Sequence, residues 1–375
     1  FGHVSVVDHI EPISLTSYRV IAVEQNASVT AWHIYVRTPG AMTGGYHPIK
    51  GFLHSPRNSH KNVSSTRGYA LVYADAAGNL LRSSPIGHFD FHEKVLVGST
   101  PVTAATPSGS LVSAVTSPNN TLEVVDAAGS IVATGISVAS GTTPAIAIAG
   151  DGSPWVAVHA ASGYLTLWHG NTTYRPTVIP APTSITTSVM MRNGASPSID
   201  LMATGAAPYV VAVTNAANAV QVVTSSGVID SGISSRLASD PAIAVEADGS
   251  YELASVSLVG HLQLSHIVAG VAQVAAPLGY TPYAGTSPDI RSALGGYQVA
   301  FVGASRNAQS FGSLGSFNAG TTLTTNNVAL DVRPDGMVAL ALRDVNGLAW
   351  VVNKSAVLST ASGVTSGAPA LALLR

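Results

Sequence analysis

Residues 143–168 read TPAIAIAGDGSPWVAVHAASGYLTLW and predict three consecutive antiparallel strands. Apolar residues alternate at first, the chain turns at Asp151-Gly152, and alternation resumes through Val156–Val158. A second turn then precedes Leu165–Trp168. Alternation with a period of two, interrupted by Asp-Gly, is the strongest local signal for a β-hairpin.

The same pattern recurs along most of the chain. Seven residues, which we call anchors, mark the start of the first strand of each repeat; they are Pro101, Pro144, Pro197, Pro241, Pro288, Val328 and Pro369. Eight residues after each of the first six anchors stands a glycine, where a tight turn favours positive φ. Repeats of about 40–45 residues with several strands each are typical of a β-propeller.

The seventh repeat stops before its own turn, because Arg375 lies only six residues after Pro369. A strand in that position needs a partner from elsewhere, and Arg19–Val23 and Ser28–Tyr35 have the pattern of a second and a third strand. We therefore expect a ring closed by the N-terminal segment, with Ala368–Leu374 pairing as an inner strand beside Arg19–Glu24. Closure of this kind removes exposed sheet edges.

Residues 41–97 are the irregular part of the pattern. Gly68–Leu80 predicts a strand, a turn and a strand, but the polar segment Asn58–Ser64 before it is a poor first strand. The segment is either a degenerate blade, which makes eight blades, or a large insertion on a seven-bladed ring. We expect an all-β fold, a single β-propeller domain over residues 1–375 with eight blades and regular repeats over residues 98–375.

Composition narrows the range of functions. Hydrophobic residues make up 46% and charged residues 10%, which excludes a disordered, solvating chain. The net charge of −2 indicates neither a nucleic-acid partner nor an anionic membrane. No apolar run is long enough for a membrane-spanning helix, so we expect no membrane span.

The absence of cysteine excludes disulfides and thiolate metal sites. The sequence starts at Phe1 without a basic and apolar leader. Together with the low charge and the abundance of Ser, Thr and Gly, this start leads us to expect an extracellular protein, secreted and freed of its signal peptide. We expect a monomer.

One repeat carries a family resemblance. Gly285-Thr286-Ser287-Pro288 with Ile290, followed by Gly295-Gly296-Tyr297 and Val299–Phe301, resembles a repeat of secreted actinobacterial β-propeller proteins of the dispase-autolysis-inducing type. The resemblance covers roughly residues 98–375. It implies an extracellular propeller without a known catalytic centre.

Charged residues recur three positions after the anchors, at Asp200, Arg291 and Asp331. Because the first strand of a blade lies nearest the axis, these side chains are expected at one depth around the ring. They are candidates for binding a polar ligand at the channel mouth. Equally, they are candidates for ion pairs between blades, since buried charges are almost always paired.

Further candidate binding residues lie on other strands. His88, Asp90 and His92 alternate along one strand and, with His60, come from the histidine-rich first quarter of the chain. Two histidines and a carboxylate are a set that Zn²⁺ or Fe²⁺ uses, but an exposed edge strand explains them as well. We expect no metal and no cofactor. Trp168 occupies a repeated position that suits either stacking on a sugar or packing between blades.

Motifs of nucleophilic hydrolases, phosphate-binding loops, zinc proteases and dinucleotide-binding folds are absent from the sequence. The sequence thus favours a secreted, non-catalytic propeller that binds a protein or glycan partner through rim loops. The alternative is an extracellular hydrolase or lyase with its site at the channel mouth, because propeller enzymes assemble their sites from scattered loops.

Overall fold

The computed structural model describes strands within residues 5–43 and most of the chain from residue 68 to residue 374. Outside the description lie the segments between the N-terminal strands, residues 44–67, and residues 86, 128, 171–182, 203–208, 274–275, 324–326 and 355–356. The contacts divide the chain into two compact units, residues 1–64 and residues 65–375. The sequence led us to expect one propeller domain over the whole chain, whereas the blades belong to the second unit alone.

The first unit is a four-stranded antiparallel sheet in chain order. Its strands are β1 (Ser5–Ser14), β2 (Ser17–Asn26), β3 (Val29–Thr38) and β4 (Ala41–Thr43). Each strand pairs with its neighbour in sequence. The alternation that marked these residues as blade strands therefore belongs to a separate meander.

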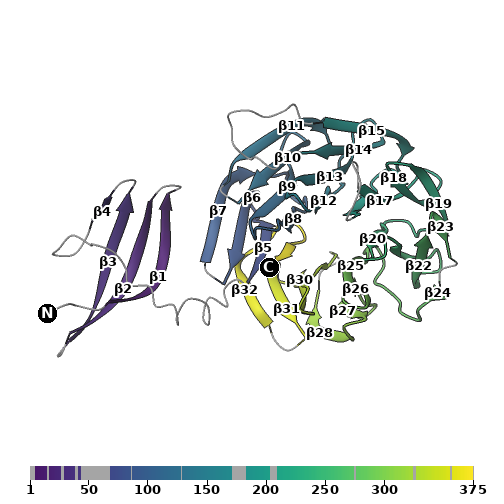
Figure 1. Cartoon of the computed structure of the whole chain (residues 1–375). Helices are drawn as coiled ribbons and strands as arrows, with labels where there is room; N and C mark the ends of the chain where they lie inside the picture. Colours follow the sequence, from purple (N-terminus) through teal and green to yellow (C-terminus); the bar gives the residue numbers. More distant parts are fainter. Residues whose placement is uncertain are drawn as a thin grey trace. The chain divides into compact units, whose positions relative to one another are not determined.

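The second unit is a β-propeller of seven blades (Figure 1). The first three blades are β33 (Ala370–Leu373) with β5 (Tyr69–Ala74), β6 (Asn79–Ser84) and β7 (Gly87–Lys94); β8 (Val102–Ala105), β9 (Leu111–Thr116), β10 (Thr121–Asp126) and β11 (Ile131–Ser137); and β12 (Ala145–Ile148), β13 (Pro154–His159), β14 (Tyr164–His169) and β15 (Thr183–Met190). The next two are β16 (Ser198–Leu201), β17 (Tyr209–Thr214), β18 (Ala219–Thr224) and β19 (Gly227–Ser234); and β20 (Ala242–Val245), β21 (Tyr251–Val256) and β22 (Leu262–Val268) with the short β23 (Val271–Ala272) and β24 (Ala276–Pro277). The last two are β25 (Asp289–Ala293), β26 (Gly296–Val302), β27 (Asn307–Gly312) and β28 (Phe317–Thr322); and β29 (Ala329–Val332), β30 (Val338–Arg343), β31 (Leu348–Asn353) and β32 (Val357–Val364).

The prediction of eight blades is wrong, and the count of anchors explains why. Each of the seven anchors immediately precedes an innermost strand, so the anchors count the blades correctly. The eighth blade came from counting residues 41–97 as a blade of their own, in addition to a closing blade that used residues 17–36. In the structure β5–β7 are themselves the partners of β33, and residues 17–36 lie in the other unit. Alternation alone predicts a strand but does not predict the sheet that it joins.

The C-terminal strand β33 joins a blade, but its partner is β5 and not Arg19–Glu24. The register places Ala370 opposite Val72 and Leu373 opposite Tyr69. Every residue of β5 is buried, which suits a strand covered on both faces. Around the axis each inner strand lies beside the next, and β33 lies beside both β29 and β8.

The core lies between neighbouring blades. One such cluster joins Val124 of β10, Val156 of β13 and Trp168 of β14, each 0–2% exposed. Burial of large apolar side chains stabilises by about 1.5–3 kcal/mol each, so the blades stabilise one another. Among the described residues no helix is long and apolar enough to cross a membrane.

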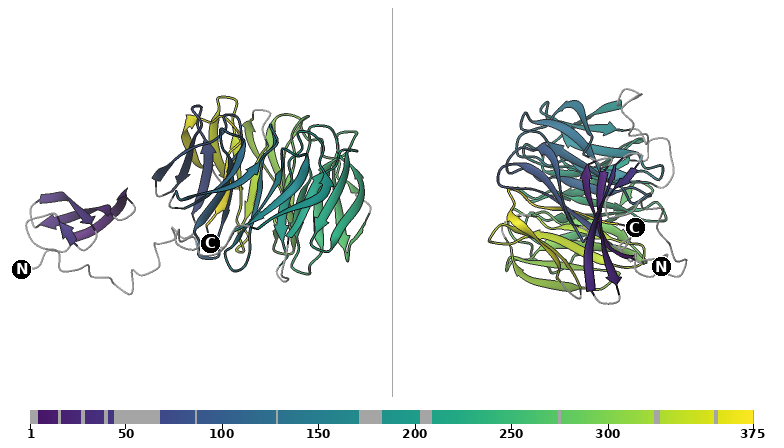
Figure 2. Two further views of the ribbon diagram at one scale, coloured as in Figure 1. Left: turned by 90° about the horizontal axis from the view of Figure 1, so that it is seen from above. Right: turned by 90° about the vertical axis from the view of Figure 1, so that its left-hand side faces the viewer.

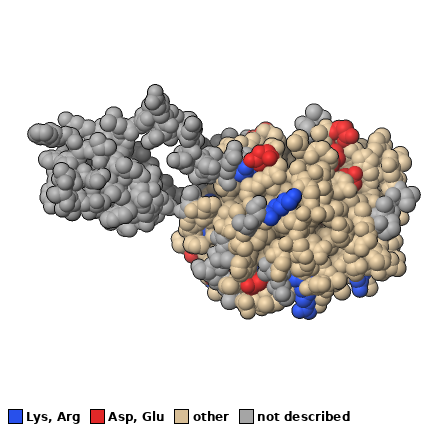
Figure 3. All heavy atoms as spheres, turned by 90° about the horizontal axis from the view of Figure 1, so that it is seen from below, with Lys and Arg blue, Asp and Glu red and all other residues tan. Residues whose placement is uncertain are grey.

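The strands run between two ends of the propeller (Figure 2). At one end, which we call the mouth end, the inner strands begin. The loop before an inner strand meets the turn between the second and third strands of the following blade, as in the bridges Val138–Ala160, Met191–Asn215 and Ser235–Ser257. At the opposite end lie the first hairpin turns, such as that at Gly152, whose φ is 89°. Few charged side chains appear on the surface in Figure 3.

Candidate functional site

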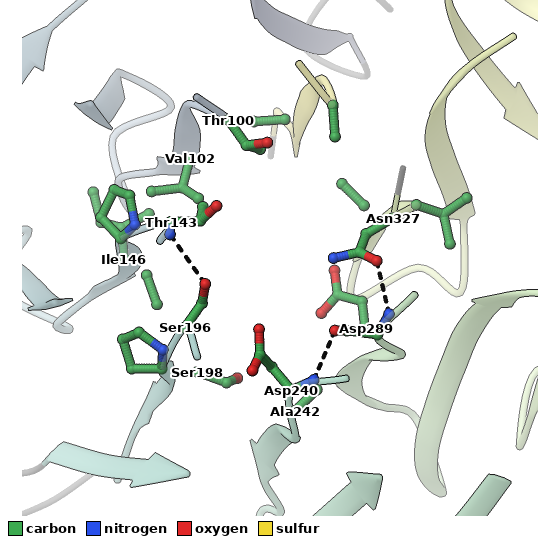
Figure 4. Close-up of a pocket in the computed structure, with 18 of the residues that line it drawn as sticks. Thr100, Val102, Thr143, Ile146, Ser196, Ser198, Asp240, Ala242, Asp289 and Asn327 are labelled. Carbon is green, nitrogen blue, oxygen red and sulfur yellow. Dashed lines mark hydrogen bonds between the residues drawn. The ribbon is translucent and has the colours of Figure 1, made fainter. Parts of the chain in front are cut away.

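A cavity of about 350 Å³ opens where the inner strands begin. The residue directly before each anchor lines it, giving a ring that we call the mouth ring: Thr100, Thr143, Ser196, Asp240, Ser287, Asn327 and Ala368. Figure 4 shows several of these side chains around an open centre. Six of the seven members are polar, so the mouth can form directed hydrogen bonds with a ligand.

The mouth ring is held together by hydrogen bonds that all run in one direction. The backbone N–H of Thr143 donates to Ser196 Oγ over 3.0 Å, that of Asp240 to Ser287 Oγ over 2.8 Å, and that of Ser287 to Asn327 Oδ1 over 2.7 Å (Figure 4). Three pairs of neighbouring blades are therefore linked through the mouth ring. The sequence analysis missed these residues, although a polar residue before most anchors was a readable signal.

Arg192 holds the only ionised member of the mouth ring in place. Its side chain is almost fully buried, and it donates to the backbone carbonyls of Arg236 and Ser239 over 3.1 and 3.0 Å. It also forms an ion pair with the Asp240 carboxylate over 3.3 Å. Burial raises the pKa of Asp240 to about 6, while hydrogen bonds from Ser196 and the charge of Arg192 oppose the rise. The sequence analysis did not identify Arg192 as a candidate site residue.

The predicted charges at the third position after the anchors connect neighbouring blades. Asp200 accepts the N–H of Leu201 and, across to the next blade, the N–H of Val245, both over 2.8 Å. Asp331 repeats this arrangement with Val332 over 2.9 Å and Leu373 over 2.6 Å. Burial raises the pKa of both carboxyls. Both carboxylates hold inner strands together, and contact with a ligand stays a prediction for them.

Arg291 is the predicted charge that lines the cavity. Its Nη1 donates to Asp289 Oδ1 and to the carbonyl of Ile290, both over 3.0 Å, and its side chain is 38% exposed. The charges of Asp289, Asp331 and Asp200 raise the pKa of its guanidinium, although burial opposes them. Arg291 is thus paired with Asp289 and interacts electrostatically with Asp331 and Asp200, and part of its surface is open to the cavity.

The histidine candidates lie far from this cavity in the fold, on β7, the outermost strand of its blade. His88, Asp90 and His92 are all exposed. His92 has a φ of 57°, and its Nδ1 lies 3.5 Å from Asp90 Oδ2. A register irregularity at this point breaks the alternation that would align the three side chains. Within the described part of the chain no three His, Asp or Glu residues come together as a metal site, and His60 lies outside it.

Trp168 packs in the core and presents no open ring face. It is 2% exposed and lies among Val124, Val156 and Val158 between two blades. The repeated tryptophan position therefore fits packing, and a sugar-stacking platform at Trp168 has no structural support.

A second cluster of ionisable groups lies within the blade of β20–β24. Glu252 is buried and lies 2.7 Å from His266 Nδ1. Burial, with the nearby carboxylates of Glu252 and Asp248, raises the pKa of Glu246 to about 7. Glu246 Oε1 is buried without a hydrogen-bond partner, so ionisation of this group is unfavourable in the folded state.

No protein-family model matches the chain, and no curated protein matches it. Among solved structures it is similar to the SapL1 lectin in complex with alpha methyl fucoside, with 11% identity over 72% of this chain and 97% of that chain and a TM-score of 0.52. AofleA from Arthrobotrys oligospora is 9% identical over 82% of this chain and 86% of that chain, with a TM-score of 0.48. The Aleuria aurantia lectin in complex with Fucalpha1-6GlcNAc is 11% identical over 84% of this chain and 94% of that chain, with a TM-score of 0.45.

The sheet topology and the likeness to the SapL1 lectin define the class of protein as a β-propeller. Likeness at this level of identity extends to the fold alone. The resemblance of the repeat to secreted actinobacterial proteins stays a prediction, because no sequence family was matched.

Proposed function

We propose that this chain is a secreted, non-catalytic binding protein that holds a glycan at the mouth of its central channel. The observation that carries the proposal is that some polar groups of the inner strands bond neighbouring blades while others border the cavity. The carboxylates of Asp200 and Asp331 are occupied by hydrogen bonds between blades, whereas the mouth ring borders an open cavity. A volume of about 350 Å³ lies at the small end of the range for ligand pockets, about 300–1,000 Å³.

The hydrogen bonds of the mouth ring determine which ligand suits it. Ser287 Oγ and Asn327 Oδ1 already accept backbone N–H groups. A hydroxyl and a carboxamide used as acceptors retain their O–H and N–H groups as donors. A ligand rich in acceptors, with hydroxyl or acetamido oxygens, fits this arrangement. Glycans are ligands of that kind, and a lectin is among the structures with the same fold.

The channel mouth offers less support to a hydrolase or lyase. Acid–base catalysis needs a carboxyl group within reach of the substrate and free to exchange protons. Asp240 is bound to Arg192, and Asp289 is bound to Arg291 and to the N–H groups of Ile290 and Leu330. Secretion is part of the proposal and is supported by the low charge, the abundance of Ser, Thr and Gly and the resemblance of the repeat to secreted proteins.

A glycan array probed with the whole chain, followed by calorimetric titration of the strongest ligand, tests the proposal. Asn327→Asp retains the acceptor for the Ser287 N–H but replaces the donor amide, and we expect it to weaken binding about tenfold or more. Asn318→Asp is the matched control, because Asn318 also accepts a backbone N–H, from Gly320 over 2.9 Å, at an exposed site on β28. Absence of binding to every glycan, equal loss in both variants, or release of cleaved product would refute the proposal.

A further inference from the structure

Beside the mouth, one blade departs from its own repeat. The turn between the second and third strands presents two central residues at the mouth end, and in β21–β22 these are Leu258 and Val259, 65% and 81% exposed. The equivalent residues of the other blades are Ala76-Ala77, Pro118-Asn119, Ala161-Ser162, Ala216-Ala217, Ala304-Ser305 and Val345-Asn346. Two large apolar side chains occur together at this position in a single blade.

A third exposed apolar side chain lies in the loop that meets this turn. Ser235 and Ser257 form a bridge, and the N–H of Arg236 donates to the carbonyl of Val256 over 2.9 Å. The next residue, Leu237, is 68% exposed. We call Leu237, Leu258 and Val259 the apolar patch. Side chains of this size exposed together are typical of interaction surfaces.

Arg236 adds a positive charge to the edge of the apolar patch. Its Nη1 lies 2.9 Å from the point that a Cβ would occupy at Gly260, so its guanidinium covers the glycine next to Val259. Among the residues that the structure describes, no carboxylate pairs with this guanidinium. By contrast, Arg192 beneath the same loop is bound to Asp240. Arginine is well suited to bind a carboxylate through two parallel hydrogen bonds.

The loop itself is strained at Ala238. This residue has a φ of 59°, whereas the equivalent residues of four other loops are glycines with φ between 75° and 85°: Gly98, Gly141, Gly194 and Gly285. A left-handed conformation is unfavourable for a residue with a Cβ. The unfavourable residue, the apolar side chains and the unpaired cation thus occur together in one pair of loops.

We infer that the apolar patch and Arg236 form a docking surface for a protein partner, which presents an apolar side chain next to a carboxylate. The apolar side chain covers Leu258 and Val259, and the carboxylate pairs with Arg236. This docking surface is separate from the mouth ring, which binds the glycan in the proposed function. Both lie at the mouth end, since Asp240 of the mouth ring closely follows Leu237 in the same loop.

A random peptide library selected on the immobilised whole chain tests this inference. We expect enriched peptides that combine an apolar residue with Asp or Glu and bind in fluorescence anisotropy with an affinity that falls as salt rises. Leu258→Ser should weaken binding about tenfold, and Arg236→Gln should weaken it and remove most of the salt dependence. Val345→Ser is the matched control, since Val345 occupies the position of Leu258 in another blade and is 54% exposed.

Three results would overturn the inference. The first is enrichment of no peptide or of basic peptides, and the second is an unchanged affinity in Leu258→Ser or an equal loss in Val345→Ser. The third is a concentration-dependent dimer, seen by sedimentation and abolished by Leu258→Ser, because the surface would then belong to a second copy of this chain.

Discussion

Substitution of Asp331 tests whether charged side chains on the inner strands stabilise the closed ring. Its Oδ1 accepts the N–H of Val332 over 2.9 Å, and its Oδ2 accepts the N–H of Leu373 over 2.6 Å. Leu373 belongs to β33, which completes the blade of β5–β7, so Asp331 binds the last regular repeat to the closing blade. Asp331→Ala removes both acceptors and leaves two N–H groups without a partner.

The magnitude follows from the cost of burying unsatisfied groups. Each stranded buried donor costs about 1–3 kcal/mol, so the variant should lose about 2–6 kcal/mol of the free energy of unfolding. Asp331→Asn retains one acceptor oxygen and should lose about half as much. A typical domain has a net stability of about 5–15 kcal/mol, so the loss in Asp331→Ala is large enough to measure.

Urea denaturation followed by circular dichroism measures these differences, provided that the slope with denaturant is unchanged. Amide hydrogen exchange adds a local test, since the Leu373 N–H should exchange faster in Asp331→Ala. Asp230→Ala is the control, because Asp230 accepts one N–H, from Gly232 over 3.0 Å, on an exposed strand and should change stability by less than about 0.5 kcal/mol. Equal stability of Asp331→Ala and the wild type would refute the reasoning.

Three further predictions concern stability. Burial in the folded state raises the pKa of Glu246 to about 7 from its usual 4.5, so the free energy of unfolding should fall as pH rises through this window. Glu246→Gln should remove this loss and stabilise the protein by about 1 kcal/mol at pH 8 but by little at pH 4.5. Thermal melts that show the same difference between variant and wild type at both pH values would contradict this prediction. Ala238→Gly should raise the free energy of unfolding by about 1 kcal/mol and Gly194→Ala should lower it by a similar amount, because both residues have a left-handed backbone conformation. Urea titration of the two variants measures these opposite changes. Trp168→Ala should lower the free energy of unfolding by about 3–5 kcal/mol yet leave glycan affinity of the folded protein unchanged, and a lost affinity at unchanged stability would make Trp168 a binding residue.

Much of the architecture was readable from the sequence, because each blade repeats the same physical requirements. An anchor, alternating apolar residues and a glycine at the turn identify the inner hairpin of most blades. The error arose at residues 17–36, whose alternation is genuine but whose sheet is separate from the blades. The strand β5, which pairs with the C-terminal strand β33, is buried along its whole length. A continuous apolar run of this kind does not indicate which strand it pairs with.

The candidate site was less predictable for a different reason. Asp200, Arg291 and Asp331 were expected at one level of the ring, but the groups that the carboxylates bind are backbone N–H groups, which carry no sequence signal. The register between blades decides which N–H lies opposite each carboxylate. Likewise, the alternation of His88, Asp90 and His92 was plain, whereas the left-handed turn at His92 that breaks it was not.

The position of a bound glycan tests the central claim most directly. We expect a crystal structure of the whole chain with the strongest ligand of the glycan array to show the sugar inside the cavity, within hydrogen-bond distance of Ser287 and Asn327. A sugar bound between the outer strands of two blades, with the mouth ring unoccupied, would contradict the account.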